Sequence, residues 1–197
     1  MNNAPLRTFH FPEGACIVQA QPPMGVPVTP SSPARAVMTD LTHVRAATIA
    51  PDMPLGQARQ TMIHQGVRLL FVVSDLPCVD GLITANDLEG ERPMQVIAQR
   101  GARYEDLSVA DVMSPLSALD AIDLGDLAHA TVGQVIATLK QIGRRHLIVV
   151  QQATSHHGPR VRGVISQAQI ERQLGHAIEM VETANSFAEI RSSLALA

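Results

Sequence analysis

The chain has no tryptophan, and aromatic residues of all kinds make up only 3% of its 197 residues. Its core must therefore be aliphatic, because 46% of the residues are nonetheless hydrophobic. Charge is also sparse: 15 Lys and Arg against 18 Asp and Glu give a net charge of −3. This balance lacks the basic surface that nucleic acids require, so we expect no nucleic-acid partner.

Signals for membranes and secretion are missing as well. No apolar run approaches the roughly 20 residues needed to cross a bilayer, and no block of Lys and Arg marks a membrane surface. Residues 1–5 lack the basic and apolar regions of a signal peptide. The two cysteines, Cys16 and Cys78, are too few and too far apart for a zinc ribbon or a disulfide framework. We therefore expect a cytoplasmic protein without membrane association.

Catalytic motifs are absent too. The eight histidines form no metal-binding spacing, and no nucleophile elbow, Walker loop or dinucleotide fingerprint occurs. We therefore expect a protein that is not an enzyme and requires no metal or cofactor.

The chain does contain an internal repeat, in which three short motifs occur twice in the same order. The matching segments are Val37–Thr39 with Val112–Ser114, Gly66–Val73 with Gly143–Val150, and Gly81–Asp87 with Gly163–Gln169. The offset between copies grows from 75 to 77 to 82 while the order is kept. Growth of this kind indicates insertions in loops, where added residues cost little.

Hydrophobic periodicity predicts the order βαββα for both copies. In the first copy we predict strands at 47–50, 69–74 and 81–84, with helices at 55–65 and from 85 to about 99. In the second we predict strands at 122–127, 146–151 and 161–166, with helices at 131–142 and 167–174. Neither copy alone can bury both faces of its sheet, so we predict an α+β fold in which the copies pack about a pseudo-twofold axis.

Two segments flank the repeats. Residues 1–35 hold seven of the 13 prolines and form an extended arm, either loose or draped over the core; the apolar Phe9, Phe11, Ile17 and Val18 favour docking. Residues 176–197 carry an apolar stripe that predicts a C-terminal helix, packed on its own subunit or in a dimer contact. Between them we assign 36–90 to the first repeat, 91–108 to a linker and 109–175 to the second.

Three motifs in the same order, twice, carry a resemblance to a known family. They are Val-Met-Thr/Ser, Gly-x-Arg-x-x-x-Val-Val, and Gly-apolar-apolar-Thr/Ser-x-x-Asp, which ends in Gln in the second copy. Over about residues 36–175 the chain resembles a pair of cystathionine-β-synthase (CBS) domains, a Bateman module. Phe71 and Ile148 stand where the family usually has proline, a change that suits a strand.

The resemblance implies a stand-alone regulatory protein that senses an adenosine-containing ligand, AMP, ADP, ATP or S-adenosylmethionine, in a cleft between the repeats. It also implies a homodimer and a signal passed to an unidentified protein partner. The alternative is a ligand-free CBS module that serves dimerisation or partner docking. The eroded second motif favours that alternative, and the intact first motif opposes it.

By resemblance, Thr84 and Asp87 hold the ribose and the first phosphate. An ionised carboxylate can accept hydrogen bonds from both ribose hydroxyls, and Asp87 lies one helical turn after Thr84. The same Thr-x-x-Asp spacing is also a capping-box variant, so a purely structural role is the alternative.

The resemblance further places Arg68, Arg145 and His146 near the phosphates, and the guanidinium fork suits phosphate oxygens. The alternative is that the arginines are solvated and the histidine is a hydrogen-bonded strand residue. In the second copy, Ser166 and Gln169 replace Thr84 and Asp87. Because Gln169 is neutral, we expect this second cleft to be weaker and each chain to hold one good site.

Overall fold

The computed structural model describes residue 8, residues 25–153 and residues 158–179. Its strands form two four-stranded sheets. In order across the first sheet these are β2 (Thr48–Ile49), β3 (Leu69–Val72), β4 (Gly81–Thr84) and β5 (Ser114–Pro115). Across the second they are β6 (Ala121–Asp123), β7 (His146–Gln151), β8 (Arg160–Ser166) and β1 (Met38–Asp40). The matched order confirms the predicted α+β fold of two equivalent units.

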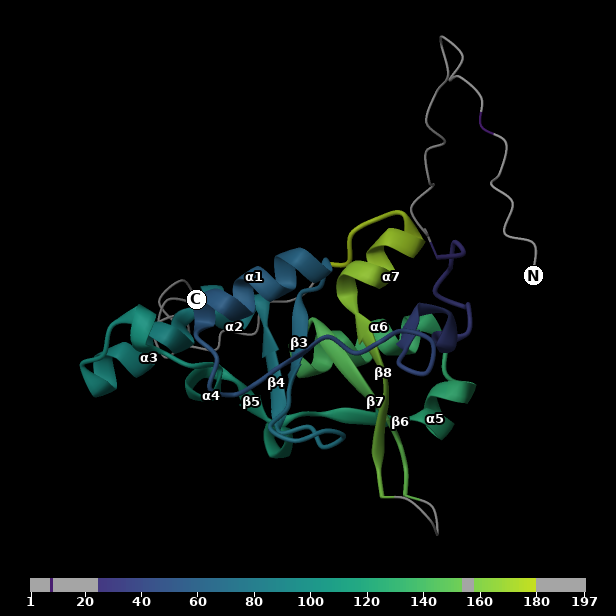
Figure 1. Ribbon diagram of the computed structural model, residues 1–197. Coiled ribbons are helices and arrows are strands. Elements are labelled where there is room, and N and C mark those ends of the chain that lie inside the picture. The colour runs from purple at the N-terminus through teal and green to yellow at the C-terminus, as the bar shows by residue number, and fades with distance from the viewer. Residues whose placement is uncertain (1–7, 9–24, 154–157, 180–197) are drawn as a thin grey trace, which may run out of the picture.

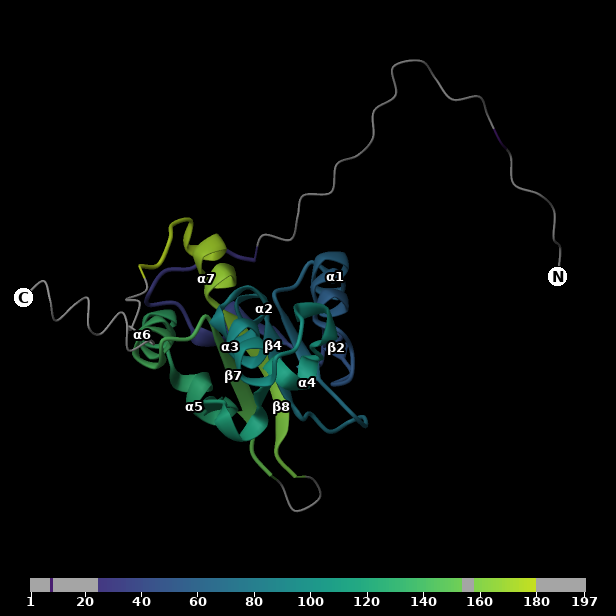
Figure 2. The same cartoon turned by 90° about the vertical axis from the view of Figure 1, so that its left-hand side faces the viewer.

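Helices cover the outer sides of the two sheets, with the strands between them (Figures 1 and 2). The first unit carries α1 (Leu55–Gln65), α2 (Ala85–Glu89), α3 (Glu91–Arg100) and α4 (Val109–Val112). The second carries α5 (Leu124–His129), α6 (Val132–Ile142) and α7 (Gln167–Leu174). Short 3₁₀ helices lie at Ala34–Val37 (η1), Tyr104–Asp106 (η2) and Leu116–Ala118 (η3).

The uninterrupted apolar runs of β3 and β7 arise because both faces of these strands are buried. Leu70 and Val72 of β3 point into a core made with α1, α2 and α4. The alternate residues Leu69 and Phe71 instead contact Ile148 of β7, in a small core between the two sheets. Side chains alternate along each strand, so one set packs against the helices of its own unit and the other set packs against the other unit.

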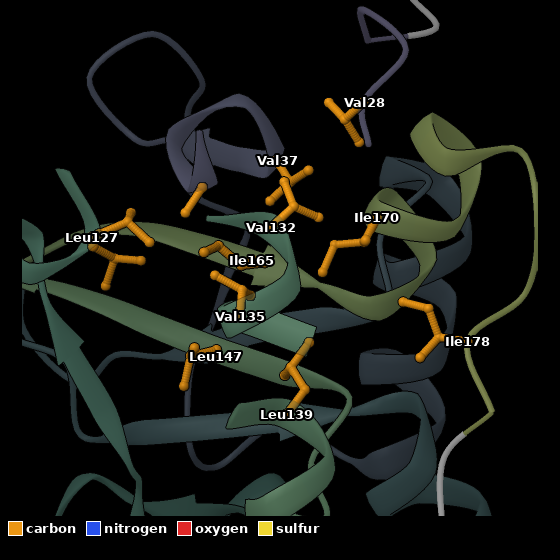
Figure 3. Packing of buried hydrophobic residues seen from close by; sticks show 12 residues of the cluster. Val28, Val37, Leu127, Val132, Val135, Leu139, Leu147, Ile165, Ile170 and Ile178 are labelled. Carbon is orange, nitrogen blue, oxygen red and sulfur yellow. The ribbon is translucent and has the colours of Figure 1, made fainter. Parts of the chain in front are cut away.

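The second unit has its own core, shown in Figure 3. Leu147 of β7 and Ile165 of β8 pack under Leu139 of α6 and Ile170 of α7. Val28 joins this core from the segment ahead of the first repeat, and its backbone N–H donates to the Gln173 carbonyl at 3.0 Å. Part of the proline-rich arm therefore docks, although Phe9, Phe11, Ile17 and Val18 lie outside the described residues.

The Val-Met-Thr/Ser segments exchange edge strands between the units. β1 precedes the first repeat yet pairs antiparallel with β8 of the second, and β5 precedes the second repeat yet pairs with β4 of the first. Arg162 of β8 donates to both carboxylate oxygens of Asp40 in β1, at 2.9 and 2.8 Å. This bidentate pair holds the pKa of Asp40 well below its usual range.

Two of the element predictions are wrong. The helix expected from 85 to 99 is two helices, because the backbone is extended at Gly90. The strand expected at 122–127 ends at Asp123, whose carboxylate accepts from the Gly125 N–H at 2.6 Å and starts α5. Of the predicted C-terminal helix, residues 180–197 lie outside the described part of the chain, and residues 176–179 are not helical.

Candidate functional site

Two of the cavities between the units are equivalent, each built from the end of the last strand of one repeat and the start of the β3 or β7 strand of the other. Cleft 1 has a volume of about 190 Å³. Its lining residues are Leu69, Leu82, Thr84, Asn86, Asp87, Ser114, Leu119, Asp120, Ile142, Gly143, Arg144, Arg145, His146 and Ile148. Thr84 and Asp87 therefore share a cavity with Arg145 and His146, although about 60 residues separate the two pairs.

Thr84 and Asp87 form a capping box at the start of α2. Oδ2 of Asp87 accepts from the Thr84 N–H at 2.8 Å and from the Thr84 hydroxyl at 2.7 Å, and the Asp87 N–H approaches the Thr84 oxygen at 3.3 Å. The structural reading of the Thr-x-x-Asp motif therefore holds for one carboxylate oxygen. Oδ1 lies 3.8 Å from Nη1 of Arg92, a loose ion pair that leaves its lone pairs available to a ligand.

Arg92 was not anticipated from the sequence. It extends from the first turn of α3, and its Nη1 donates to the Val112 carbonyl and to the Ser114 hydroxyl, both at 2.9 Å. Ser114 is buried and lines cleft 1. Arg92 thus holds Ser114, a lining residue of cleft 1, and places a positive charge 3.8 Å from the Asp87 carboxylate.

The opposite wall of cleft 1 comes from the turn between α6 and β7. Gly143 ends α6 in the left-handed conformation, with φ of 62°, so that the chain reverses into β7. The exposed Arg144 and Arg145 follow it. Burial lowers the pKa of His146 to about 4, the nearby charges of Arg68 and Arg145 act in the same direction, and Asp87 opposes them. His146 is therefore neutral at physiological pH and can both donate and accept hydrogen bonds.

Cleft 2 is the equivalent cavity of the other repeat, with a volume of about 380 Å³. Its polar lining consists of Thr39, Arg45, Gln65, Arg68, His146, Ser166, Gln169 and Arg172. The Ser166 hydroxyl accepts from the Gln169 N–H at 3.2 Å, as a helix cap requires. The Gln169 side chain, however, donates to the Gln173 amide oxygen at 2.9 Å instead of returning to the cap. The second motif therefore differs from the first in geometry as well as in charge.

The structure places Arg68 in cleft 2 and not with Thr84 and Asp87 in cleft 1, where the resemblance implies that it lies. The Arg68 carbonyl does accept from the Ala85 N–H at 3.0 Å, so its backbone lies beside the start of α2. Its side chain nevertheless lines the cavity of Ser166 and Gln169. Each Gly-x-Arg segment thus serves the cleft of the other repeat, because both clefts form between the units.

Several other lining residues were missed, and the repeat offset could have found them. Ser114 of cleft 1 follows Thr39 of cleft 2 by 75 residues, the offset that relates the two Val-Met-Thr/Ser motifs. Leu69 and His146 are likewise equivalent, 77 residues apart, and each lines both cavities. These two positions form the wall that the clefts share.

Other kinds of site receive no support from the described ranges. No group of three or more His, Cys, Asp or Glu in them could hold a metal ion. No helix in the same ranges is both long and apolar enough to cross a bilayer.

Comparison with known proteins agrees with this architecture. Residues 34–91 match the family model of the CBS domain. No curated protein matches the chain. An uncharacterised conserved protein from Pyrococcus horikoshii superposes with a TM-score of 0.54 at 16% identity, over 78% of this chain and 100% of that one. A CBS domain pair solved with 5′-methylthioadenosine and S-adenosyl-L-methionine gives 0.51 at 16% identity, over 74% and 98%.

A CBS-domain protein from Agrobacterium tumefaciens gives a TM-score of 0.49 at 21% identity, over 68% of this chain and 88% of that one. The family model matches the first unit and the second unit has the same strand order, so the chain has the fold of a CBS domain pair, the Bateman module that the repeated motifs predicted. As a class, such pairs are regulatory modules and in general not catalysts.

Proposed function

We propose that the protein is a regulatory sensor that binds an adenosine-containing ligand in cleft 1 and passes the signal to a protein partner or to a second copy of itself. The observation that carries the proposal is the meeting of a carboxylate from one repeat with two guanidinium groups from the other in a single cavity. A nucleotide needs both, because its ribose offers hydroxyl donors and its phosphate offers anionic acceptors.

Oδ1 of Asp87 is the acceptor for the ribose hydroxyls, since Oδ2 is held by the capping box. Charge-assisted hydrogen bonds of this kind contribute about 1.5–3 kcal/mol each. Arg144 and Arg145 bind the phosphate, or the carboxylate of S-adenosylmethionine. His146 is neutral and lines the same cavity, so it borders the ribose and phosphate positions without adding charge.

The volume of cleft 1, about 190 Å³, is below the roughly 300–1,000 Å³ of typical ligand pockets. Arg144 and Arg145 are exposed and form one wall, so we expect these flexible side chains to move outward when a nucleotide enters. A ligand held between the units favours one relative arrangement of them, and this differential affinity is the physical origin of a signal.

A related fold supports the ligand class. The CBS pair solved with 5′-methylthioadenosine and S-adenosyl-L-methionine shares this fold, and both of its ligands contain adenosine. The list of candidates for cleft 1 therefore stays AMP, ADP, ATP and S-adenosylmethionine.

Titration calorimetry of the full chain with AMP, ATP and S-adenosylmethionine tests the proposal. We expect one ligand to bind and Asp87→Asn to weaken it at least about tenfold, since about 1.4 kcal/mol corresponds to a factor of ten. The matched control is Asp111→Asn, because Asp111 forms the same capping box with Ser108, at 2.9 and 2.8 Å, outside both clefts. The control should keep full affinity.

Equal affinity of wild type and Asp87→Asn would contradict the assignment of the ribose site. Failure of all three ligands to bind would favour the assembly function, in which the CBS pair serves only dimerisation or partner docking.

A further inference from the structure

Cleft 2 is built from backbone segments equivalent to those of cleft 1, but its lining is positively charged. Two carboxylates and two guanidinium groups line cleft 1, so their charges cancel. Three arginines, Arg45, Arg68 and Arg172, line cleft 2, and none of its described lining residues is acidic. No ion pair within 4.0 Å joins these three arginines to any carboxylate of the described residues.

The difference arises in corresponding segments of the two repeats. Gln169 stands where the first repeat has the carboxylate of Asp87, and the segments ahead of β2 and β6 contribute Arg45 to cleft 2 and Asp120 to cleft 1. Arg172 adds a third cation where the first repeat has Gly90. These exchanges remove both acidic groups and leave cations from three separate elements around one cavity.

The amide nitrogen of Gln169 is also committed to a partner outside the cleft lining. The Gln169 amide nitrogen donates to Gln173, whose own amide nitrogen donates to the carbonyls of Val26 and Ala36, both at 3.0 Å. Gln173 is buried, so this chain of hydrogen bonds ties Gln169 to the segment before β1. Without a carboxylate, the cleft offers ribose hydroxyls no charged acceptor.

We propose that cleft 2 binds a small phosphate anion of several charges, such as a diphosphate or triphosphate group, through Arg45, Arg68 and Arg172 and without recognising a nucleoside. Guanidinium groups bind phosphate oxygens in a bidentate manner. Three of them around a cavity of about 380 Å³, within the usual range of ligand sites, suit a chain of two or three phosphates. Inorganic triphosphate and the tail of a nucleotide present the same chemistry.

This site goes beyond the proposed nucleotide function, because it uses another cleft and needs no ligand in cleft 1. The shared wall of Leu69 and His146 means that an anion in cleft 2 borders the first cleft. The protein would then bind a phosphate anion in cleft 2 and an adenosine-containing compound in cleft 1.

Calorimetric titration of the full chain with inorganic triphosphate, ATP and adenosine, at about 0.15 M salt to screen loose surface charge, tests this inference. We expect triphosphate to bind and each of Arg45→Gln and Arg172→Gln to weaken it about tenfold. Arg45→Asp, which reverses the charge at this position, should weaken it further. Both residues are exposed, so these variants should fold.

Arg59→Gln is the matched control, since Arg59 is an exposed arginine of α1 that pairs with Glu89 outside both clefts. Triphosphate affinity should be unchanged in this variant and in Asp87→Asn. Adenosine should not displace triphosphate, and ATP should compete for the same site through its tail.

Three results would overturn the inference: no binding of triphosphate, equal weakening by Arg59→Gln, or displacement of triphosphate by adenosine. The two proposals fail separately. Loss of AMP, ATP and S-adenosylmethionine binding at cleft 1 with triphosphate binding intact removes only the adenosine function, and the reverse result removes only the anion site.

Discussion

Replacing His146 by leucine should remove a loss of stability that the wild-type protein undergoes between pH 7 and pH 5. Burial lowers the pKa of this imidazole to about 4, whereas in the unfolded chain it returns to about 6.5. Between these values the unfolded state binds a proton that the folded state does not. The free energy of unfolding therefore falls as the pH is lowered through this window and levels off below about pH 4.

The magnitude follows from the two pKa values. A shift from about 6.5 to about 4 lowers the free energy of unfolding by about 2 kcal/mol between pH 7 and pH 5. Asp40, Asp106 and Asp111 have pKa values below their usual range. Their stabilising effect is lost only as the pH approaches the ordinary aspartate value of about 3.9, so they do not obscure the window above pH 5.

Urea unfolding at pH 7 and pH 5 measures the effect. Leucine is the natural replacement, because Leu69 occupies the equivalent position in the first repeat. The wild type should lose about 2 kcal/mol across this range, and His146→Leu should lose little. A control, His43→Gln, removes an exposed histidine and should keep the wild-type pH dependence. If His146→Leu loses as much stability as the wild type, the imidazole is not held neutral by burial.

Two further predictions concern stability. Leu70→Ala empties a fully buried position in the core of the first unit and should lower the free energy of unfolding by about 2–5 kcal/mol, measured by urea titration. Gly81→Ala should destabilise the protein and broaden its thermal transition, because a Cβ there would collide with the backbone of β5. The control is Gly56→Ala in α1, where an added Cβ meets nothing within 4 Å. It should raise the free energy of unfolding by about 0.5–1 kcal/mol. An equal effect of the two substitutions would contradict the close approach of β4 and β5.

Much of the secondary structure followed from local patterns. The strands Gly81–Thr84 and His146–Gln151 and the helix Gln167–Leu174 lie where periodicity and glycine boundaries predicted them. The errors occurred where a single side chain or backbone angle decided the outcome. Asp123 turns a predicted strand into α5 through one hydrogen bond, and the extended backbone at Gly90 splits a predicted helix.

The sequence alone determined that the protein consists of two equivalent units, because a repeated pattern of apolar and glycine residues dictates a repeated fold. It also identified Thr84 and Asp87 as the more promising pair, since the contrast with Ser166 and Gln169 is chemical and can be read directly.

Only the tertiary structure decided which residues share a cleft. The units exchange edge strands and face each other, so Arg145 joins Asp87 while Arg68 joins Gln169. The opposite charges of Asp120 in cleft 1 and Arg45 in cleft 2 become apparent only once the lining of each cavity is known. The physical reason is that cavities form between units, and contacts across an interface depend on packing that no local pattern encodes.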